Sequence, residues 1–357
     1  GSDKRLHSLN PRAFDFSIEY QQKFLEHYLP ILENTPYVCG GTHWNFIDFS
    51  SALRDESMPR INNKGLAYSD RTPKDVFYYY KAAWRKDIPV LHIASRDWIY
   101  RTGIQQGDSS VLLPVKIYTN LPEVELSIDG KSLGRQQVDN YTAIFKAPFS
   151  SKEPLLLVQG NYQGTTVQDG IKVHFTPIPT NLNSTGLKDL ELAVNVGSQC
   201  FYTSDESRLT WLPDQPYTKG SWGYIGGKEL STQTEIRRTA DGPLFQTLRN
   251  GIEGYRFDVP RGVYEVELLF TDIFLQNEGI AYQLGREGEQ KSRENTFGIS
   301  VNGKMLEEKL SPCKESGYCQ AVRKKYIITN DTDHIDIRFH PASGTCFLNG
   351  IKLRNIH

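Results

Sequence analysis

Two aspartates near the amino terminus, Asp48 and Asp55, come closest to a catalytic carboxylate pair in this sequence. Hydrolysis of a glycosidic bond requires two carboxyl groups about 5–9.5 Å apart, often with one raised pKa. Asp48 lies among aromatic residues in the run HWNFIDF, where it could equally serve as a structural hydrogen-bond acceptor. Acidic residues elsewhere fall at turns or on strand faces, which favours solvated side chains. We therefore predict no catalytic pair within this sequence.

The five cysteines do not form a metal-binding pattern. No CxxC or HxxxH spacing occurs, so we predict no metal site and no cofactor. Cys313 and Cys319 bracket a five-residue loop and could pair, while Cys200 and Cys346 lie near opposite ends of the last segment. Mostly buried thiols are the alternative for so few cysteines, and the sequence leaves both states open.

Charge and hydropathy exclude two classes of partner. The chain has 41 basic and 42 acidic residues, closely interspersed, for a formal charge of −1. A nucleic-acid binder needs a one-sided basic field, which is missing here. The longest apolar stretches, such as Val263 to Phe274, contain charges and are shorter than a membrane span. A length of 357 residues favours two or three domains.

Residues 1–87 have an α/β pattern. Apolar spacing predicts a helix from Ser17 to Asn34, with Pro30 inside it, and then a buried strand from Tyr37 to Phe49. Thr72-Pro73 has the composition of a helix start, with Thr as the N-cap. One strand and two helices cannot bury their apolar faces alone. We therefore predict a piece of a larger domain that docks on the rest of the chain or on another copy in a homo-oligomer.

The remaining residues have two successive all-β patterns. Residues 88–177 hold about seven short strands separated by turns, including the hairpin signal Asp129-Gly130, which predicts an immunoglobulin-like sandwich. Residues 178–189 are polar and are interpreted as a linker. Residues 190–357 hold longer strands, which predicts a jelly-roll-like sandwich. The expected fold class is mainly β.

Particular motifs in the first half resemble the glycoside hydrolases of family 2. The run YVCGGTHWNFIDFSS, followed by MPRINNKGLAYSDRTPKDVFYYYKAAW, is similar to the end of the (β/α)8 barrel in that family. The runs LHIASRDWIYR and YTNLPEVELSIDGKSLG resemble the sandwich that follows the barrel in β-galactosidase-like members. The resemblance implies the C-terminal part of a retaining exo-β-glycosidase, with β-galactosidase specificity first and β-glucuronidase as the alternative.

The same resemblance indicates which residues contact the substrate. Family members use two glutamates on earlier barrel strands, and no residue here matches either motif, so both are expected upstream in a missing N-terminal part. Trp44 matches an aromatic residue that packs against the sugar. Asn62 and Lys64 match a pair that β-glucuronidases use on the substrate carboxylate, although relatives described as β-galactosidases have similar runs. The implied location is periplasmic or secreted.

Residues 190–357 resemble malectin-like carbohydrate-binding domains through AVNVGSQCFYTSD, YTKGSWGYIGG and TCFLNGIKLRN, although the long insert QNEGIAYQLGREGEQKSREN departs from that pattern. Such domains bind sugars with aromatic and polar residues on loops at one edge. By this match the candidates are Tyr202, Asp205, Trp222, Tyr224 and Asn349. Core packing or turn hydrogen bonding is the competing interpretation for each. A non-catalytic carbohydrate-binding module and a purely structural half of an enzyme remain alternatives.

Overall fold

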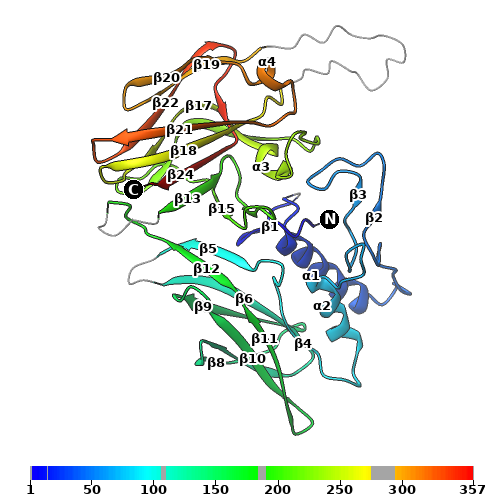
Figure 1. Cartoon of the computed structure of the whole chain (residues 1–357). Coiled ribbons are helices and arrows are strands. Elements are labelled where there is room, and N and C mark those ends of the chain that lie inside the picture. The colour runs from blue at the N-terminus through cyan, green and yellow to red at the C-terminus, as the bar shows by residue number, and fades with distance from the viewer. Residues whose placement is uncertain (1, 14, 106–109, 184–189, 275–293, 357) are drawn as a thin grey trace, which may run out of the picture. The chain divides into compact units, whose positions relative to one another are not determined.

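The computed structural model describes residues 2–13, 15–105, 110–183, 190–274 and 294–356. Part of the expected linker and nearly all of the long insert lie outside the described residues. The chain divides into two compact units, residues 1–179 with 200–210 and residues 180–199 with 211–357 (Figure 1). Among the described residues, no helix has the length and apolar character needed to cross a membrane.

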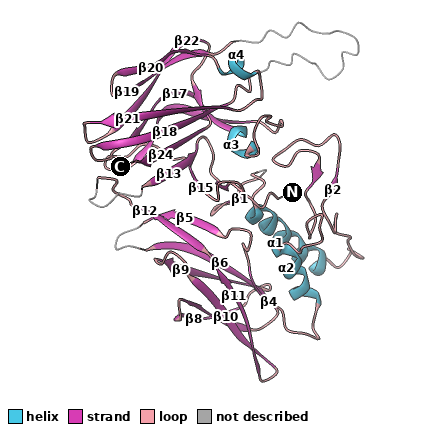
Figure 2. Cartoon of the chain, in the orientation of Figure 1, coloured by secondary structure: helices cyan, strands magenta, loops and turns pink. Residues whose placement is uncertain are grey.

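The first unit contains two helices and a β-sandwich (Figure 2). The helices are α1 (Ile18–Asn34) and α2 (Asp75–Trp84). The strands are β1 (Leu6–His7), β2 (Phe49–Ser50), β3 (Ile61–Asn62), β4 (Leu91–Ile93), β5 (Tyr100–Ile104), β6 (Val111–Thr119), β7 (Glu123–Ile128), β8 (Lys131–Gln137), β9 (Thr142–Phe149), β10 (Leu155–Tyr162), β11 (Thr165–Lys172), β12 (His174–Ile178) and β14 (Phe201–Thr203).

The sandwich has one sheet of order β4-β6-β9 and another of order β11-β10-β7-β8. Alternate residues of β6 and β9 in the first sheet face those of β7 and β10 in the second, which puts Val115, Phe145, Leu126 and Val158 in one core. The β7–β8 hairpin turns through Asp129-Gly130, whose φ angles of 50° and 78° are both positive, as the sequence predicted.

Helices α1 and α2 pack together and against this sandwich. Ser17 accepts a hydrogen bond from the Tyr20 amide at 3.0 Å and so caps α1, which begins where the apolar pattern predicted. Leu25 and Leu29 of α1 share a buried cluster with Val76 of α2 and Tyr118 of β6. The predicted docking of the first segment on the rest of the chain is therefore present within one unit.

Two sequence predictions for this segment are wrong. Residues 37–48 form no strand: the run contacts residues 66–67 through a single β-bridge, Ile47 to Ala67, and a few backbone hydrogen bonds. Tyr37, Trp44 and Phe46 are exposed. Helix α2 begins at Asp75 rather than at Pro73. Its predicted first turn is extended because the Lys74 amide donates to the Leu66 carbonyl at 2.9 Å.

Two carboxylates attach the helices to the segment that follows β4, besides Glu26 of α1, which bonds to Lys116 of β6 at 2.7 Å. Asp75, at the start of α2, is buried and accepts hydrogen bonds from Gln22 (3.2 Å), His92 (2.7 Å) and the Ser95 amide (2.8 Å). Glu19 of α1 accepts from His7 at 3.1 Å and from the Ser95 hydroxyl at 2.8 Å. Both carboxylates therefore converge on the short segment that follows β4.

The second unit is a two-sheet sandwich with two short helices, α3 (Gly242–Gln246) and α4 (Pro312–Ser316). Its strands are β13 (Glu191–Asn195), β15 (Thr210–Pro213), β16 (Trp222–Ser231), β17 (Thr247–Phe257), β18 (Gly262–Phe270), β19 (Thr296–Val301), β20 (Lys304–Leu310), β21 (Val322–Asn330), β22 (Ile335–Ser343), β23 (Phe347–Leu348) and β24 (Gly350–Asn355). One sheet has the order β15-β13-β24-β18-β21 and the other β16-β17-β22-β19-β20, with β23 on β17.

Leu268 and Leu353 of the first sheet and Ile299 and Ile337 of the second are fully buried between these strands. Each of the five cysteines carries a thiol rather than a disulfide. The predicted fold class, mainly β with two sandwiches, is confirmed.

We expect the attachment of the helices to weaken in acid. Burial raises the pKa of Asp75 and Glu19, but hydrogen bonds and attraction from His92 and His7 outweigh it, so both pKa values lie below their usual 3.8 and 4.5. A lowered folded-state pKa contributes stability above the usual value, and this stability is lost as pH falls through the folded value.

The measurement is the urea midpoint of the helical circular-dichroism signal, which should fall as pH drops below 4.5. In Asp75→Asn the midpoint should be lower at neutral pH and should change less with acid, because an amide does not ionise. An acid dependence equal to that of the unmodified chain would contradict this role for Asp75.

Candidate functional site

The three residues predicted to contact substrate lie in one loop region of the first unit. Trp44 is 68% exposed, and its ring meets the edge of Phe49 at a centroid distance of 6.1 Å. Phe49 pairs with Asn62 across the β2–β3 ladder, which places Asn62 one strand away from this aromatic pair. Lys64 follows two residues later with an exposed side chain. The sequence prediction therefore selected neighbouring residues.

Backbone contacts fix how Asn62 and Lys64 are presented. Asn62 is nearly buried, and its Oδ1 accepts a hydrogen bond from the Lys64 amide at 3.3 Å. This contact uses the amide oxygen of Asn62 and leaves its NH2 group as the donor for a ligand. His43 Nε2 lies 3.4 Å from the Lys64 carbonyl oxygen, and burial lowers the pKa of His43. The Lys64 ammonium remains in solvent.

A buried ion pair lies beneath this loop. Lys74 Nζ is 2.9 Å from Asp48 Oδ1 and donates to the Asn63 carbonyl oxygen at 3.1 Å. Asp48 Oδ1 also accepts from the Gly65 amide at 2.9 Å. A Cβ atom on Gly65 would lie 2.5 Å from the Asp48 nitrogen, so the loop approaches the pair closely only with glycine there. The ion pair therefore fixes the backbone on both sides of Lys64.

This geometry removes Asp48 from the candidates for acid–base chemistry. Burial raises the pKa of Asp48 and lowers that of Lys74, while their mutual attraction opposes both shifts. A carboxylate that is 3% exposed and bonded to an ammonium and an amide cannot reach a substrate. Asp55 is exposed and lies outside this network. The region can bind a ligand through Lys64, Asn62 and Trp44, but it holds no carboxylate pair.

The burial of Asn63 has no signal in the sequence. Asn63 is fully buried, and both its amide nitrogen and amide oxygen are without a hydrogen-bond partner among the described residues. Its backbone carbonyl accepts from both the Ser2 amide and Lys74. Buried amides normally find partners, so this position could be recognised from the structure but not from the sequence.

The malectin-like candidates are divided between the two units. Tyr202 and Asp205 belong to the first unit, where Tyr202 pairs with Leu6 on β1. Trp222 and Asn349 are fully buried in the second unit and present no face to a sugar. The Asn349 amide donates to Phe245 and Thr247 carbonyls at 2.9 Å and accepts from the Thr271 amide, so its role is structural.

Tyr224 is the partly exposed aromatic residue of this set in the second unit. The Arg249 guanidinium carbon lies 3.2 Å from the centroid of its ring. Arg249 is in turn held by buried Asp214, at 2.9 Å from Nε. One face of Tyr224 is therefore occupied by a cation, and sugar contact at Tyr224 and at exposed Asp205 stays a prediction.

Comparison with known proteins identifies the relatives of the chain. Residues 190–353 match the malectin domain, and residues 111–165 match a domain of unknown function (DUF4982). The chain is similar to a crystal structure of a Bacteroides uniformis β-glucuronidase, with 74% sequence identity and a TM-score of 0.93. The match covers 100% of this chain and 41% of that protein's chain. The homologues of this chain are β-glucuronidases of glycoside hydrolase family 2. The resemblance stated from the sequence is confirmed.

Other relatives carry the same activity in their names. Bacteroides uniformis β-glucuronidase 2, covalently bound to cyclophellitol-6-carboxylate aziridine, is 74% identical over 100% of this chain and 40% of that chain, with a TM-score of 0.92. A putative β-glucuronidase of Formosa agariphila is 33% identical over 233 residues, 61% of this chain and 27% of that protein. A Bacteroides fragilis β-glucuronidase is 37% identical over 116 residues, 32% of this chain and 16% of that protein.

The chain thus spans about a quarter or less of the length of these two curated glycoside hydrolases. Of the two specificities named from the sequence, the comparisons favour β-glucuronidase over β-galactosidase.

Substitution of Lys74 should lower the free energy of unfolding much more than substitution of Lys64. Lys74→Met leaves the buried Asp48 carboxylate unpaired, and breaking a buried pair costs about 3–5 kcal/mol of unfolding free energy. Lys64→Met removes an exposed charge and should change stability by less than about 0.5 kcal/mol. Urea denaturation of the two variants measures the difference, and equal losses would show that Lys74 does not support the loop.

Proposed function

We propose that this chain is part of a β-glucuronidase and supplies the loop that binds the substrate carboxylate. The observation that carries the proposal is the exposed Lys64 ammonium beside Asn62, on a backbone held from beneath by Asp48 and Lys74. A fixed cation with an adjacent amide donor is complementary to a uronate carboxylate. That a 74% identical protein binds a carboxylate-bearing cyclophellitol supports this assignment.

Trp44 has a second role in the proposal. Its exposed indole lies beside Phe49, and a flat aromatic face packs well on the C–H side of a pyranose ring. The carboxylate contact would orient the sugar, and the ring contact would hold its apolar face. The catalytic carboxylates come from another part of the longer enzyme, since Asp48 is committed to Lys74.

The exposed apolar residues of the first segment fit the same proposal. Phe24, Tyr28, Ile31 and Leu53 are all at least 46% exposed. Phe24 and Tyr28 lie next to each other, with ring centroids 4.5 Å apart, and exposed apolar side chains that gather in this way often mark an interface. We infer that the part of the enzyme outside this chain covers these side chains.

The test is Lys64→Ala in the longer enzyme. A charge-assisted hydrogen bond is worth about 1.5–3 kcal/mol, so kcat/KM for a nitrophenyl glucuronide should fall about ten- to hundredfold. Turnover of the matching galactoside, which has no carboxylate, should hardly change and serves as the internal control. Lys64→Arg, which keeps the charge, should retain part of the glucuronide activity. Equal losses on both substrates would show that the loop does not recognise the carboxylate.

A further inference from the structure

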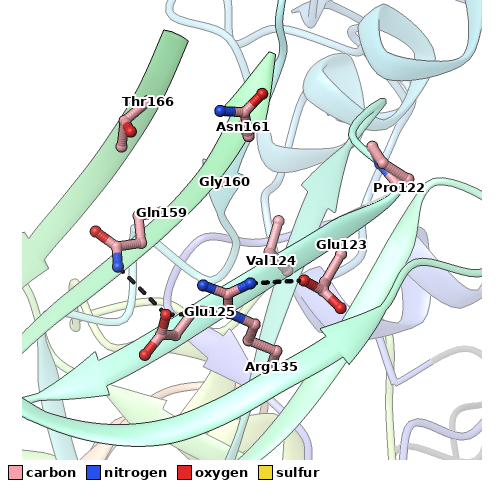
Figure 3. Close-up of a pocket in the computed structure, with 9 residues that line it drawn as sticks. All are labelled: Pro122, Glu123, Val124, Glu125, Arg135, Gln159, Gly160, Asn161 and Thr166. Carbon is pink, nitrogen blue, oxygen red and sulfur yellow. Dashed lines mark hydrogen bonds and ion pairs between the residues drawn. The ribbon is translucent and has the colours of Figure 1, made fainter. Parts of the chain in front are cut away.

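A cleft of about 380 Å3 lies in the first unit, in the sheet of β8, β7, β10 and β11 (Figure 3). It forms where two neighbouring strands separate. The β7–β10 register ends at Gln159 opposite Glu125, whereas β10 continues along β11 as far as Tyr162 opposite Thr165. The cleft lies where the β7–β10 pairing ends, over Gly160 and the side chains that surround it. Its volume falls within the range of small-molecule sites, about 300–1,000 Å3.

Gly160 allows the strands to stay close at the base of this cleft. A Cβ atom on Gly160 would lie 2.5 Å from Leu121 Cδ1 and 3.1 Å from the Glu123 carbonyl oxygen. A larger residue would have to displace the Leu121 side chain and would crowd the Glu123 carbonyl. In Figure 3, Gly160 lies between Gln159 and Asn161 on β10, with Val124 on the neighbouring strand. The cleft is thus a defined feature of the sheet.

The polar side chains of the cleft are held in place by one another. Arg135 lies between two carboxylates, with Nη1 3.3 Å from Glu123 Oε1 and Nε 3.5 Å from Glu125 Oε2. Gln159 donates to Glu125 Oε2 at 3.3 Å, and Ser132 donates to Glu125 Oε1 at 2.6 Å. A network of this kind limits the side-chain entropy that a ligand must overcome on binding.

Further hydrogen-bonding capacity remains for a ligand. Asn161 Oδ1 accepts from the Gly164 amide at 2.9 Å, which leaves its NH2 group as a donor. The Thr166 hydroxyl can donate and accept. The carboxylates of Glu123 and Glu125 retain acceptor positions, since each oxygen has two lone pairs. The cleft therefore offers both donors and acceptors, as the hydroxyl groups of a sugar require.

The charge of the cleft selects against acids. Two carboxylates and one guanidinium leave a net charge of −1. An anionic ligand such as a uronate would be repelled, because like charges across a site cost binding free energy. None of the nine lining residues is aromatic, so stacking does not contribute and the affinity is modest. We propose that this cleft binds a neutral sugar residue of a glycan, separately from the carboxylate-binding loop.

The test is isothermal titration of the 357-residue chain carrying Lys64→Ala, which removes the cation of the carboxylate-binding loop, with methyl β-D-glucoside, methyl β-D-galactoside, cellobiose and glucuronic acid. At least one neutral probe should bind with a Kd on the order of 1 mM, and glucuronic acid should bind at least about tenfold more weakly. Arg135→Ala and Thr166→Ala should each weaken the neutral probe about five- to tenfold. The Arg135 side chain is 68% exposed, so its removal does not threaten folding.

Lys172→Ala is the matched control. Lys172 is a cation on β11 that does not line the cleft, and its side chain is 60% exposed, close to the 68% of Arg135. It should leave binding unchanged. Glu123→Gln with Glu125→Gln should reverse the preference and admit glucuronic acid, because Arg135 then sets the charge. Absence of binding by every neutral probe would overturn the proposal. Binding that survives Arg135→Ala would place the sugar elsewhere and would also overturn it, whatever the turnover results for Lys64.

Discussion

The hydrogen bonds accepted by Asp75 and Glu19 are the interaction on which the first unit depends. The helices of residues 1–87 bury Leu25, Leu29 and Val76 in a cluster that is completed by Tyr118 of the sandwich, so their position depends on attachment to it. Asp75 joins α1, α2 and the segment after β4 through Gln22, His92 and the Ser95 amide. The loop that carries Lys64 lies between these helices in the chain, so this attachment positions it as well.

The same loop shows how one residue type takes two roles through its surroundings. Lys74 is enclosed and paired with Asp48, so it holds the backbone. Lys64 is exposed and is left to meet a ligand. Gly65 joins the two, because its missing side chain lets the loop approach Asp48. A rigid base beneath an exposed cation is the arrangement that the proposed carboxylate contact requires, because little has to rearrange on binding.

Sequence patterns predicted the elements whose partners are local. Helix α1, the Asp129-Gly130 hairpin and the two sandwiches follow from spacing and turn residues. Of the strand expected at residues 37–49, only Phe49 lies in a strand, and the aromatic residues Tyr37, Trp44 and Phe46 before it are exposed. The sequence also did not predict which aromatic residues are buried. Trp222 lies in a glycine-rich run that resembles a binding loop, yet it is fully buried. No residue pattern predicted that the β7–β10 pairing ends at Gln159.

Complementation tests the central claim most directly, that the chain supplies substrate recognition but not the catalytic carboxylates. The chain would be mixed with the part of the Bacteroides uniformis β-glucuronidase that lies outside the matched region, and glucuronide hydrolysis measured. The account predicts no turnover by this chain alone, turnover by the mixture, and loss of that turnover with Lys64→Ala. Hydrolysis by the purified chain alone, or full glucuronide turnover by the other part without it, would contradict the account.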